Sequence, residues 1–413
     1  MNTWNRRQFL TTTAGLALMS GQANANWTQW RGPSRDGMVD ESYPWPKTLD
    51  EQSLKKVWEK PLSPSYSGPI VKDGTVFVTE TVGKKDERVT AFNTETGEQI
   101  WQESWAGAMK VPFFAASNGS WIRSTPAVSD GHLLVGGIRD VLVCLDPETG
   151  AKIWTNDFVQ TQNSKVPSFG FVSSPLIEGE FAFVQAGGAL LKIELSTGKV
   201  IWRSLDDGGG MYGSAFSSPV FATLGGERQL LVQTRESLVG VNAESGKKLW
   251  SVKVPAFRGM NILPPTPFKD MVFTSSYKNG SFGYQIVRSS DGQFSVQEKW
   301  KNRAAGYMSN PMVFGDYVYL HLGNGRLTCM ELATGKQRWS SRPFGKYWSS
   351  IAQGNRMLSL DERGDLLLVE PNKDSFNLIG KQKVASNSWA HLAMVGDQLF
   401  VRDLDKLTVY RWA

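Results

Sequence analysis

The chain has 413 residues, of which 40% are hydrophobic and only 20% charged, a balance that argues against long disorder and allows a sizeable core. Its 41 Gly and 19 Pro favour a turn-rich protein over a helical bundle, and the Gly residues lack the three-residue period of collagen. The formal net charge of +6 is modest, and no dense basic block indicates a nucleic-acid or membrane patch.

Residues 1–25 have the features of an export signal. A twin-arginine motif occupies residues 5–10, an apolar stretch follows over residues 14–19, and residues 23–25 supply a small-residue cleavage pattern. We therefore expect export by the twin-arginine route, cleavage after Ala25, and a periplasmic or secreted protein. There is no Cys near the cleavage site, so a lipid anchor is not indicated. No later segment approaches the ~18 apolar residues needed to span a bilayer.

Two short segments precede the repetitive part of the chain. Residues 26–53 form an N-terminal leader that opens with Trp27-Thr-Gln-Trp30-Arg-Gly-Pro-Ser-Arg-Asp-Gly37. Residues 54–58 predict a β-strand that carries its own Trp58 and has no partner strand nearby in the sequence.

An internal repeat follows the leader. Each unit predicts four short strands joined by turns, and its fourth strand carries Gly, three further residues and then Trp. The repeated Trp residues are spaced by roughly 39 to 53 residues, which matches one blade of a β-propeller. The matching segments are Thr96-Gly97…Trp101, Thr149-Gly150…Trp154, Thr197-Gly198…Trp202, Ser245-Gly246…Trp250 and Thr334-Gly335…Trp339, with a longer variant at Asp291-Gly292…Trp300.

The number of units predicts a closed ring. Six complete units are followed by a degenerate seventh, from Trp348 to about Val384, with Leu378 at the expected Trp position. The last unit, residues 389–412, has three strands, and residues 54–58 can supply the fourth and remove an exposed edge. We therefore predict an all-β, eight-bladed propeller of four-stranded antiparallel blades, closed by an N-terminal strand, within one domain at residues 54–413.

The repeated Trp residues are interpreted as structural. A large flat ring on each outer strand can pack between neighbouring blades and bury ~150–250 Å². The predicted blade-docking residues are Trp58, Trp101, Trp154, Trp202, Trp250, Trp300 and Trp339.

The repeat pattern, apolar-x-Asp/Asn/Glu-x-x-Thr-Gly-x-x-x-Trp, resembles that of the pyrroloquinoline-quinone (PQQ) propeller family over residues 54–412. The leader is similar to that of secreted bacterial members with this repeat. The family includes quinoprotein dehydrogenases and non-enzymatic scaffolds, such as the propeller lipoprotein of the outer-membrane β-barrel assembly machinery. The resemblance therefore implies the fold but leaves both functions open.

The residues favour a binding or scaffold protein. The dehydrogenases of this family have an adjacent Cys-Cys pair and a carboxylate-rich Ca²⁺ site, whereas here the positions that enter the channel carry no carboxylate. These positions are Tyr66, Arg123, Val172, Phe216, Pro264, Met308, Tyr347 and Trp389. Loops with Asp140, Glu236, Asp361 and Glu362 could still approach the same mouth. We predict no cofactor, and the alternative function is a quinoprotein-like oxidoreductase that uses PQQ and Ca²⁺.

Other motifs carry little functional weight. Residues 208–213 fit G-x-G-x-x-G, but the strand and helix of a dinucleotide site are not predicted around them. Cys144 and Cys329 occupy matching points of distant repeats, so we expect buried free thiols rather than a disulfide. The three His residues lie in separate repeats, so we do not expect a zinc site.

The predicted binding surface is the channel mouth. The loops that lead into four consecutive inner strands are long, the longest between Trp101 and Pro126, so they would wall one side of the mouth. We expect a protein or an anionic or aromatic small molecule as partner, a monomer, and no nucleic acid. The candidate residues are Tyr66, Arg123, Phe216, Tyr347, Trp389 and His391.

Overall fold

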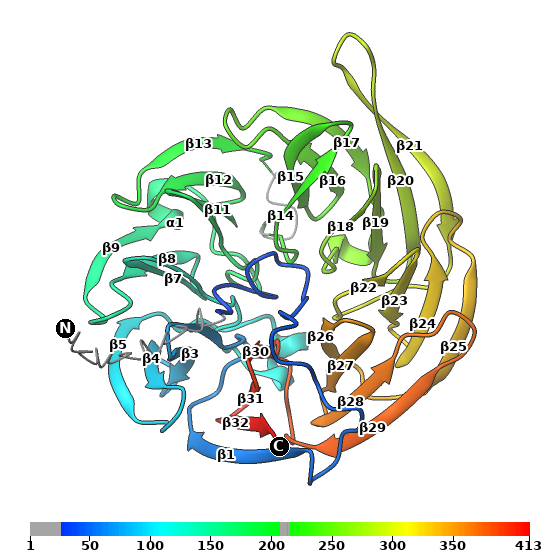
Figure 1. Ribbon diagram of the computed structural model, residues 1–413. Helices are drawn as coiled ribbons and strands as arrows, with labels where there is room; N and C mark the ends of the chain where they lie inside the picture. Colours follow the sequence, from blue (N-terminus) through cyan, green and yellow to red (C-terminus); the bar gives the residue numbers. More distant parts are fainter. Residues whose placement is uncertain (1–25, 207–212, 214) are drawn as a thin grey trace, which may run out of the picture.

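The computed structural model describes residues 26–206, 213 and 215–413, and nearly all regular structure in them is β-strand. Eight four-stranded antiparallel sheets follow one another around a central axis (Figure 1). The eight-bladed propeller predicted from the repeat is thereby confirmed. The predicted export signal and most of the glycine-rich run at 208–213 lie outside the described residues.

Blades 1 to 4 follow the chain order. Blade 1 contains β2 (Ile70–Lys72), β3 (Thr75–Val82), β4 (Asp86–Asn93) and β5 (Gln99–Ala106). Blade 2 contains β6 (Ala127–Ser129), β7 (His132–Gly137), β8 (Val141–Leu145) and β9 (Lys152–Asp157). Blade 3 contains β10 (Leu176–Glu178), β11 (Phe181–Ala186), β12 (Ala189–Glu194) and β13 (Val200–Ser204). Blade 4 contains β14 (Val220–Leu224), β15 (Glu227–Gln233), β16 (Ser237–Val241) and β17 (Lys248–Lys253).

Blades 5 to 8 complete the ring. Blade 5 contains β18 (Thr266–Phe268), β19 (Met271–Ser276), β20 (Gly280–Arg288) and β21 (Phe294–Asn302). Blade 6 contains β22 (Met312–Phe314), β23 (Tyr317–His321), β24 (Arg326–Glu331) and β25 (Gln337–Pro343). Blade 7 contains β26 (Trp348–Gln353), β27 (Arg356–Asp361), β28 (Asp365–Glu370) and β29 (Asn377–Lys383). Blade 8 contains β30 (Ala393–Val395), β31 (Gln398–Asp403), β32 (Lys406–Trp412) and β1 (Leu54–Pro61).

Helices are few and short. Among the described residues they are α1 (Phe158–Thr161) and the 3₁₀ turns η1 (Phe113–Asn118) and η3 (Phe257–Gly259), all in loops between blades. No helix in the described ranges is long and apolar enough to cross a bilayer.

The N-terminal strand closes the ring. β1 pairs antiparallel with β32, which places Trp58 opposite Val409 and gives blade 8 its outer strand (Figure 1). The middle strands of each blade are buried on both faces because neighbouring blades cover them, and they read as continuous apolar runs such as Leu366–Val369.

Trp residues span the gaps between blades. A β-bulge precedes each Trp, and at six of the seven positions the indole N–H donates to a backbone carbonyl of the next blade. The Trp58 Nε1 to Thr94 O distance is 2.8 Å. The next blade offers a glycine in the left-handed region: at Gly97, with φ +69°, an added Cβ would lie 2.8 Å from the Trp58 ring. The same hydrogen bond is made by Trp101, Trp154, Trp202, Trp300 and Trp339.

Trp250 departs from this arrangement. Its indole N–H donates to Gln229 Oε1 within its own blade. The next blade carries the extended hairpin of β20 and β21, which projects beyond the ring in Figure 1. The turn glycine of that hairpin, Gly292, has no indole ring within 4 Å of an added Cβ.

Blade 7 corrects one detail of the repeat assignment. The bulge of β29 places Gly380 opposite Leu368, and Leu378 lies two residues before the position that Trp occupies elsewhere. Leu49 of the leader forms a parallel bridge with Gly380, where an added Cβ would overlap the Leu49 backbone. A segment from outside the repeat therefore occupies the place of the missing Trp.

The leader also crosses one face of the channel, as the dark blue trace in Figure 1 shows. It begins on blade 1, where Trp27 N donates to Val71 O at 2.8 Å, and ends on blade 7, where Val39 N donates to Ala352 O at 2.7 Å. Between these points the buried Arg35 donates to carbonyls of blade 3, and Arg31 donates to a carbonyl at the start of blade 6. The channel is thus closed at one end.

The two cysteines are buried and free, as expected, in blades 2 and 6. Burial raises the pKa of the Cys144 thiol to about 12 and that of Cys329 to about 11. Both thiols are therefore uncharged, and they pack as small apolar side chains.

Candidate functional site

A cavity of about 420 Å³ lies on the propeller axis, with leader residue Trp30 at its closed end. The channel is therefore a pocket with a mouth on the face opposite the leader. The six candidate residues predicted from the sequence all line this cavity. The other three ring positions, Val172, Pro264 and Met308, line it as well. The lining thus includes Tyr66, Arg123, Val172, Phe216, Pro264, Met308, Tyr347, Trp389 and His391.

The repeat explains why these positions converge. Each of the eight ring positions lies just before an inner strand, and the inner strands are the ones nearest the axis. Equivalent residues of eight blades therefore surround one opening. The sequence predicts this ring because it depends only on the position within each unit.

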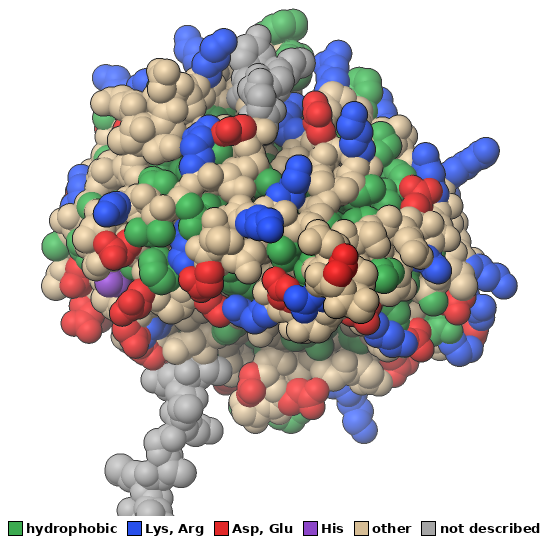
Figure 2. Space-filling model, turned by 90° about the horizontal axis from the view of Figure 1, so that it is seen from above, with side chains coloured by type: hydrophobic (Ala, Val, Ile, Leu, Met, Phe, Trp, Pro, Cys, Tyr) green, Lys and Arg blue, Asp and Glu red, His purple; other side chains and the backbone are tan. Residues whose placement is uncertain are grey.

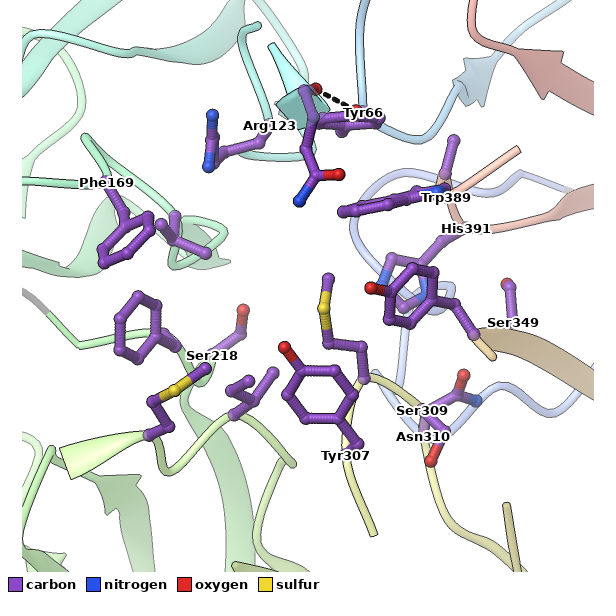
Figure 3. A pocket seen from close by; sticks show the side chains of 18 of the residues that line it. Tyr66, Arg123, Phe169, Ser218, Tyr307, Ser309, Asn310, Ser349, Trp389 and His391 are labelled. Carbon is purple, nitrogen blue, oxygen red and sulfur yellow. Dashed lines mark hydrogen bonds between the residues drawn. The ribbon is translucent and has the colours of Figure 1, made fainter. Parts of the chain in front are cut away.

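Aromatic rings form one wall of the pocket. Tyr66 stacks on Trp389 with ring centroids 4.6 Å apart and an interplanar angle of 16°, and Tyr347 lies 4.2 Å from the same indole. Figure 3 shows Tyr66 and Trp389 on one side of the hollow, Phe169 on the other, and the Tyr307 ring between them at its edge. The Tyr66 hydroxyl donates to the Asn118 carbonyl, which attaches the longest insert to this wall.

Arginines give the pocket a positive charge. Arg123 is half-buried; its Nε donates to Trp121 O at 3.1 Å, and its buried Nη2 has no hydrogen-bond partner within the described residues. Burial lowers the pKa of Arg123 to about 10, although Tyr66 and Glu87 oppose the shift. The group remains charged at neutral pH, with one donor available to an anionic ligand.

Two further arginines line the mouth. The Arg235 guanidinium lies 5.0 Å from the Phe216 ring centroid, and its Nη2 donates to Arg258 O at 2.7 Å. Arg258 in turn lies 5.1 Å from the Phe257 ring. No Asp or Glu of the described chain lines this pocket.

The four carboxylates considered from the sequence do not reach the mouth. Asp140 accepts a hydrogen bond from Gly187 N of the neighbouring blade 3, and the buried Asp361 accepts from Gly345 N, so backbone donors of adjacent loops engage both carboxylates. Glu362 accepts from Tyr347 N, and Glu236 is exposed beside the pocket. The pocket therefore does not offer the set of carboxylate oxygens that Ca²⁺ prefers, and its residues do not fit a PQQ–Ca²⁺ site.

His391 lies at the closed end, against the leader. Its imidazole makes an edge contact with Trp30, with ring centroids 5.4 Å apart. Burial and, to a smaller extent, the nearby charge of Arg31 lower the pKa of His391 to about 3. The ring is therefore neutral at physiological pH and belongs to the pocket floor.

Long loops build the opposite wall, as expected. Phe114 of the longest insert packs edge to face against Phe169 of the second insert, with ring centroids 6.2 Å apart. Phe169 packs in the same way against Phe216, with ring centroids 5.7 Å apart. Phe257 of the fourth insert lies beside them. The sequence indicated loop length but not which side chains would point inward. It also missed Trp30, because nothing in the repeat pattern connects the leader to the axis.

Two serine hydroxyls of the pocket are hydrogen-bonded to the backbone. Ser309 Oγ donates to His321 O at 2.8 Å, and Ser349 Oγ accepts from Leu392 N at 2.9 Å, so both hydroxyls serve the fold. In the part of the chain that the structure describes, no lining serine is hydrogen-bonded to a histidine or carboxylate base. The pocket can hold an aromatic group that carries negative charge.

Comparisons with known proteins agree with the fold. The family profile for outer membrane protein assembly factor BamB matches residues 85–341. The chain is 23% identical to the BamB of Yersinia pestis, over 98% of both proteins.

Solved structures give the same architecture. The chain resembles BamB from Moraxella catarrhalis with a TM-score of 0.62 and 14% identity, covering 87% of this chain and 100% of that one. It resembles the quinohemoprotein alcohol dehydrogenase of Comamonas testosteroni with a TM-score of 0.66 and 15% identity, covering 94% of this chain and 80% of that one. Identities this low establish a shared fold but do not distinguish a scaffold from a dehydrogenase.

Proposed function

This chain belongs to the family of outer membrane protein assembly factor BamB, and we propose that it is a non-enzymatic binding protein that holds its partner at the mouth of the axial pocket. One observation carries the proposal: a blind pocket lined by aromatic rings and three arginines, without a carboxylate among its described lining residues. Rigid aromatic side chains and arginines dominate binding hot spots, whereas acid–base catalysis needs a group that titrates near neutral pH; the described lining has no carboxylate, and its one histidine, His391, has its pKa lowered to about 3.

The site and the closed ring support each other. The pocket floor is the leader, and the walls come from all eight blades, so the side chains are held by a rigid frame before any partner arrives. Such pre-organisation reduces the entropy lost on binding. The relatives named as outer membrane assembly factors are consistent with a partner that is a protein.

Cellular location and assembly remain part of the proposal. The twin-arginine motif and cleavage pattern at residues 1–25 support action in the periplasm, and we propose separately that the protein is a monomer. Fractionation of the native host, with size-exclusion chromatography of the processed protein, tests both statements. An absorbance spectrum of that material, with and without added PQQ and Ca²⁺, tests the oxidoreductase alternative, since a bound quinone would displace our proposal.

The binding site is tested with substitutions inside and outside the pocket. A thermal-shift screen of peptides and small anions identifies a ligand, whose affinity is then measured for Arg123→Ala and Trp389→Ala. We expect each to lose about tenfold or more, the range of interface hot spots. Ile153→Ala, at a 43% exposed position on the outer strand β9, is the matched control. If both pocket variants fold and bind like the wild type, the site lies elsewhere.

A further inference from the structure

The mouth presents more apolar surface than a ligand inside the hollow could cover. Phe113 and Phe114 on η1 are 91% and 50% exposed, and Phe257 on η3 is 41% exposed. Phe113 and Phe114 contact each other edge to face at 5.6 Å. Large exposed aromatic side chains at the edge of a pocket mark a surface that a partner covers.

Cations accompany these aromatic residues. Arg258 lies 6.0 Å from the Phe114 ring and 5.1 Å from the Phe257 ring, and Lys278 lies 4.5 Å from Phe257. Arg258 and Lys278 give the rim a positive charge on the side walled by the long inserts, and Arg123 adds a positive charge inside the pocket.

In blades 1 and 2 the exposed turns on the two sides of the ring differ in charge. In blades 1 and 2 the turns on the mouth side carry exposed Lys84, Lys85 and Arg139, against one exposed carboxylate, Asp86. The turns on the opposite side of the same blades expose acidic residues that include Glu95, Glu98 and Glu148. The outer rim seen in Figure 2 mixes acidic and basic side chains. A positive potential at the mouth attracts acidic partners and repels basic ones.

The shape of the site selects among anionic partners. A flat bilayer cannot enter a hollow of about 420 Å³, and a small molecule that fills the hollow leaves Phe113 exposed. A polypeptide can do both, because one side chain inserts while its backbone lies across the rim. The longest insert, which holds η1, is also joined to the inner wall through Tyr66 and Asn118, so rim and pocket form one surface.

We propose that the pocket binds an extended polypeptide segment in which acidic residues flank an aromatic side chain; this inference rests on the function proposed above. The aromatic side chain packs against Trp389 and Tyr347, and a neighbouring carboxylate accepts a hydrogen bond from Arg123 Nη2. A second carboxylate faces Arg258, and the segment covers Phe113 and Phe257.

The test uses the full processed chain and four fluorescent twelve-residue peptides. The first peptide has a central Phe flanked by Asp and Glu. In the second, Asn and Gln replace these acidic residues, and in the third, Lys replaces them. The fourth keeps the acidic residues but has Ala in place of the Phe. Fluorescence anisotropy measures each affinity at low and at physiological salt. We expect the acidic aromatic peptide to bind at least tenfold more tightly than the other three, with affinity falling as salt rises.

Variants locate the peptide. Arg123→Ala should weaken binding about tenfold, Arg123→Lys should retain part of it, and Phe113→Ser should weaken it several-fold without affecting the fold, since that side chain is 91% exposed. Ile153→Ser on the outer strand should bind as the wild type does. Circular dichroism and thermal melts check that each variant is folded.

The outcomes separate the two proposals. Equal binding of acidic and neutral peptides, with both lost in Trp389→Ala, contradicts the charge selectivity but keeps the pocket as the binding site. Two further probes are indole-3-acetate, a small aromatic anion, and phosphatidylglycerol vesicles. If the protein binds either of them but none of the peptides, a polypeptide partner is contradicted. Peptide binding that no pocket variant changes contradicts both proposals.

Discussion

Two junctions of the ring solve the same packing problem in different ways. Between blades 3 and 4, Trp202 of the repeat lies against Gly246, and its indole N–H donates to Ala243 O at 3.3 Å. Between blades 7 and 8 the repeat offers Gly380 instead of Trp, and leader residues Leu49 and Trp45 are buried there. Trp45 lies 6.3 Å from Trp412 of blade 8.

The comparison shows that the space between blades must be filled, but not by any particular part of the chain. A void between two sheets would lose the contacts of every atom that lines it, so natural packing density requires a large side chain there. At the degenerate blade a segment more than three hundred residues away in sequence supplies that volume. The leader is therefore part of the fold as well as the floor of the pocket.

The largest expected effect separates closure from leader packing. Deleting residues 26–61 removes both the leader and β1, which exposes the edge of β32, so we expect loss of cooperative unfolding and aggregation. Deleting residues 26–53 keeps β1, and this protein should still fold with a lower melting temperature. Thermal melts and light scattering measure both. Identical melting of the 26–61 deletion and the intact chain would mean that β1 does not close the ring.

A repeat junction should be costly to empty. Trp202→Ala should lower the free energy of unfolding by about 3–5 kcal/mol, the range for truncating a buried Phe or Trp side chain to Ala. Trp202→Phe keeps much of the ring but loses the donor to Ala243, so it should cost less. Chemical denaturation gives both values. A cost below 1 kcal/mol for Trp202→Ala would show that the repeated Trp is not what holds the blades together.

At the junction between blades 7 and 8, the cost of a substitution should depend on whether the leader is present. Gly380→Ala places a Cβ on the backbone of Leu49, so it should destabilise the intact protein by about 1–3 kcal/mol, the usual cost of overpacking. In the protein that lacks residues 26–53 the same substitution meets no leader and should be nearly neutral. Denaturation of the four proteins forms a double-mutant cycle. Equal costs in both backgrounds would contradict the contact between Leu49 and Gly380.

The smallest effect concerns two histidines, of which only one touches the leader. His391 lies under Trp30, whereas His321 stacks on Trp348 of blade 7 at 4.7 Å, and burial lowers the pKa of His321 to about 4. Because the unfolded state takes up a proton near pH 6.5 and the folded state does not, stability should fall as pH drops below about 6.5.

Histidine NMR titration measures this directly. Both rings should remain neutral down to about pH 5 in the intact protein. Deleting residues 26–41, which removes Trp30 and Arg31, should raise the pKa of His391 toward 6.5 and leave that of His321 in place. Equal shifts at the two positions would indicate general loosening rather than loss of a leader contact.

The candidate site was predictable where it follows the repeat. Tyr66, Arg123 and Trp389 share a position within their units, and symmetry alone brings such positions to the axis. Phe169 and Tyr277 were not predictable in this way, because the one belongs to an insert and the other to a turn between the second and third strands of blade 5. A side chain's direction in such segments depends on contacts with neighbouring loops.

The sequence by itself determined the strand order, the number of blades and the closing strand, since alternation and turn residues are local signals that recur from unit to unit and the Gly…Trp pattern recurs in six of them. Only the tertiary structure decided that the leader fills the seventh junction and closes the channel, and that carboxylates such as Asp140 and Asp361 accept hydrogen bonds from backbone N–H groups of adjacent loops. Those outcomes depend on which volumes and which backbone donors the finished ring leaves unfilled, and one segment of sequence cannot reveal a space created by another.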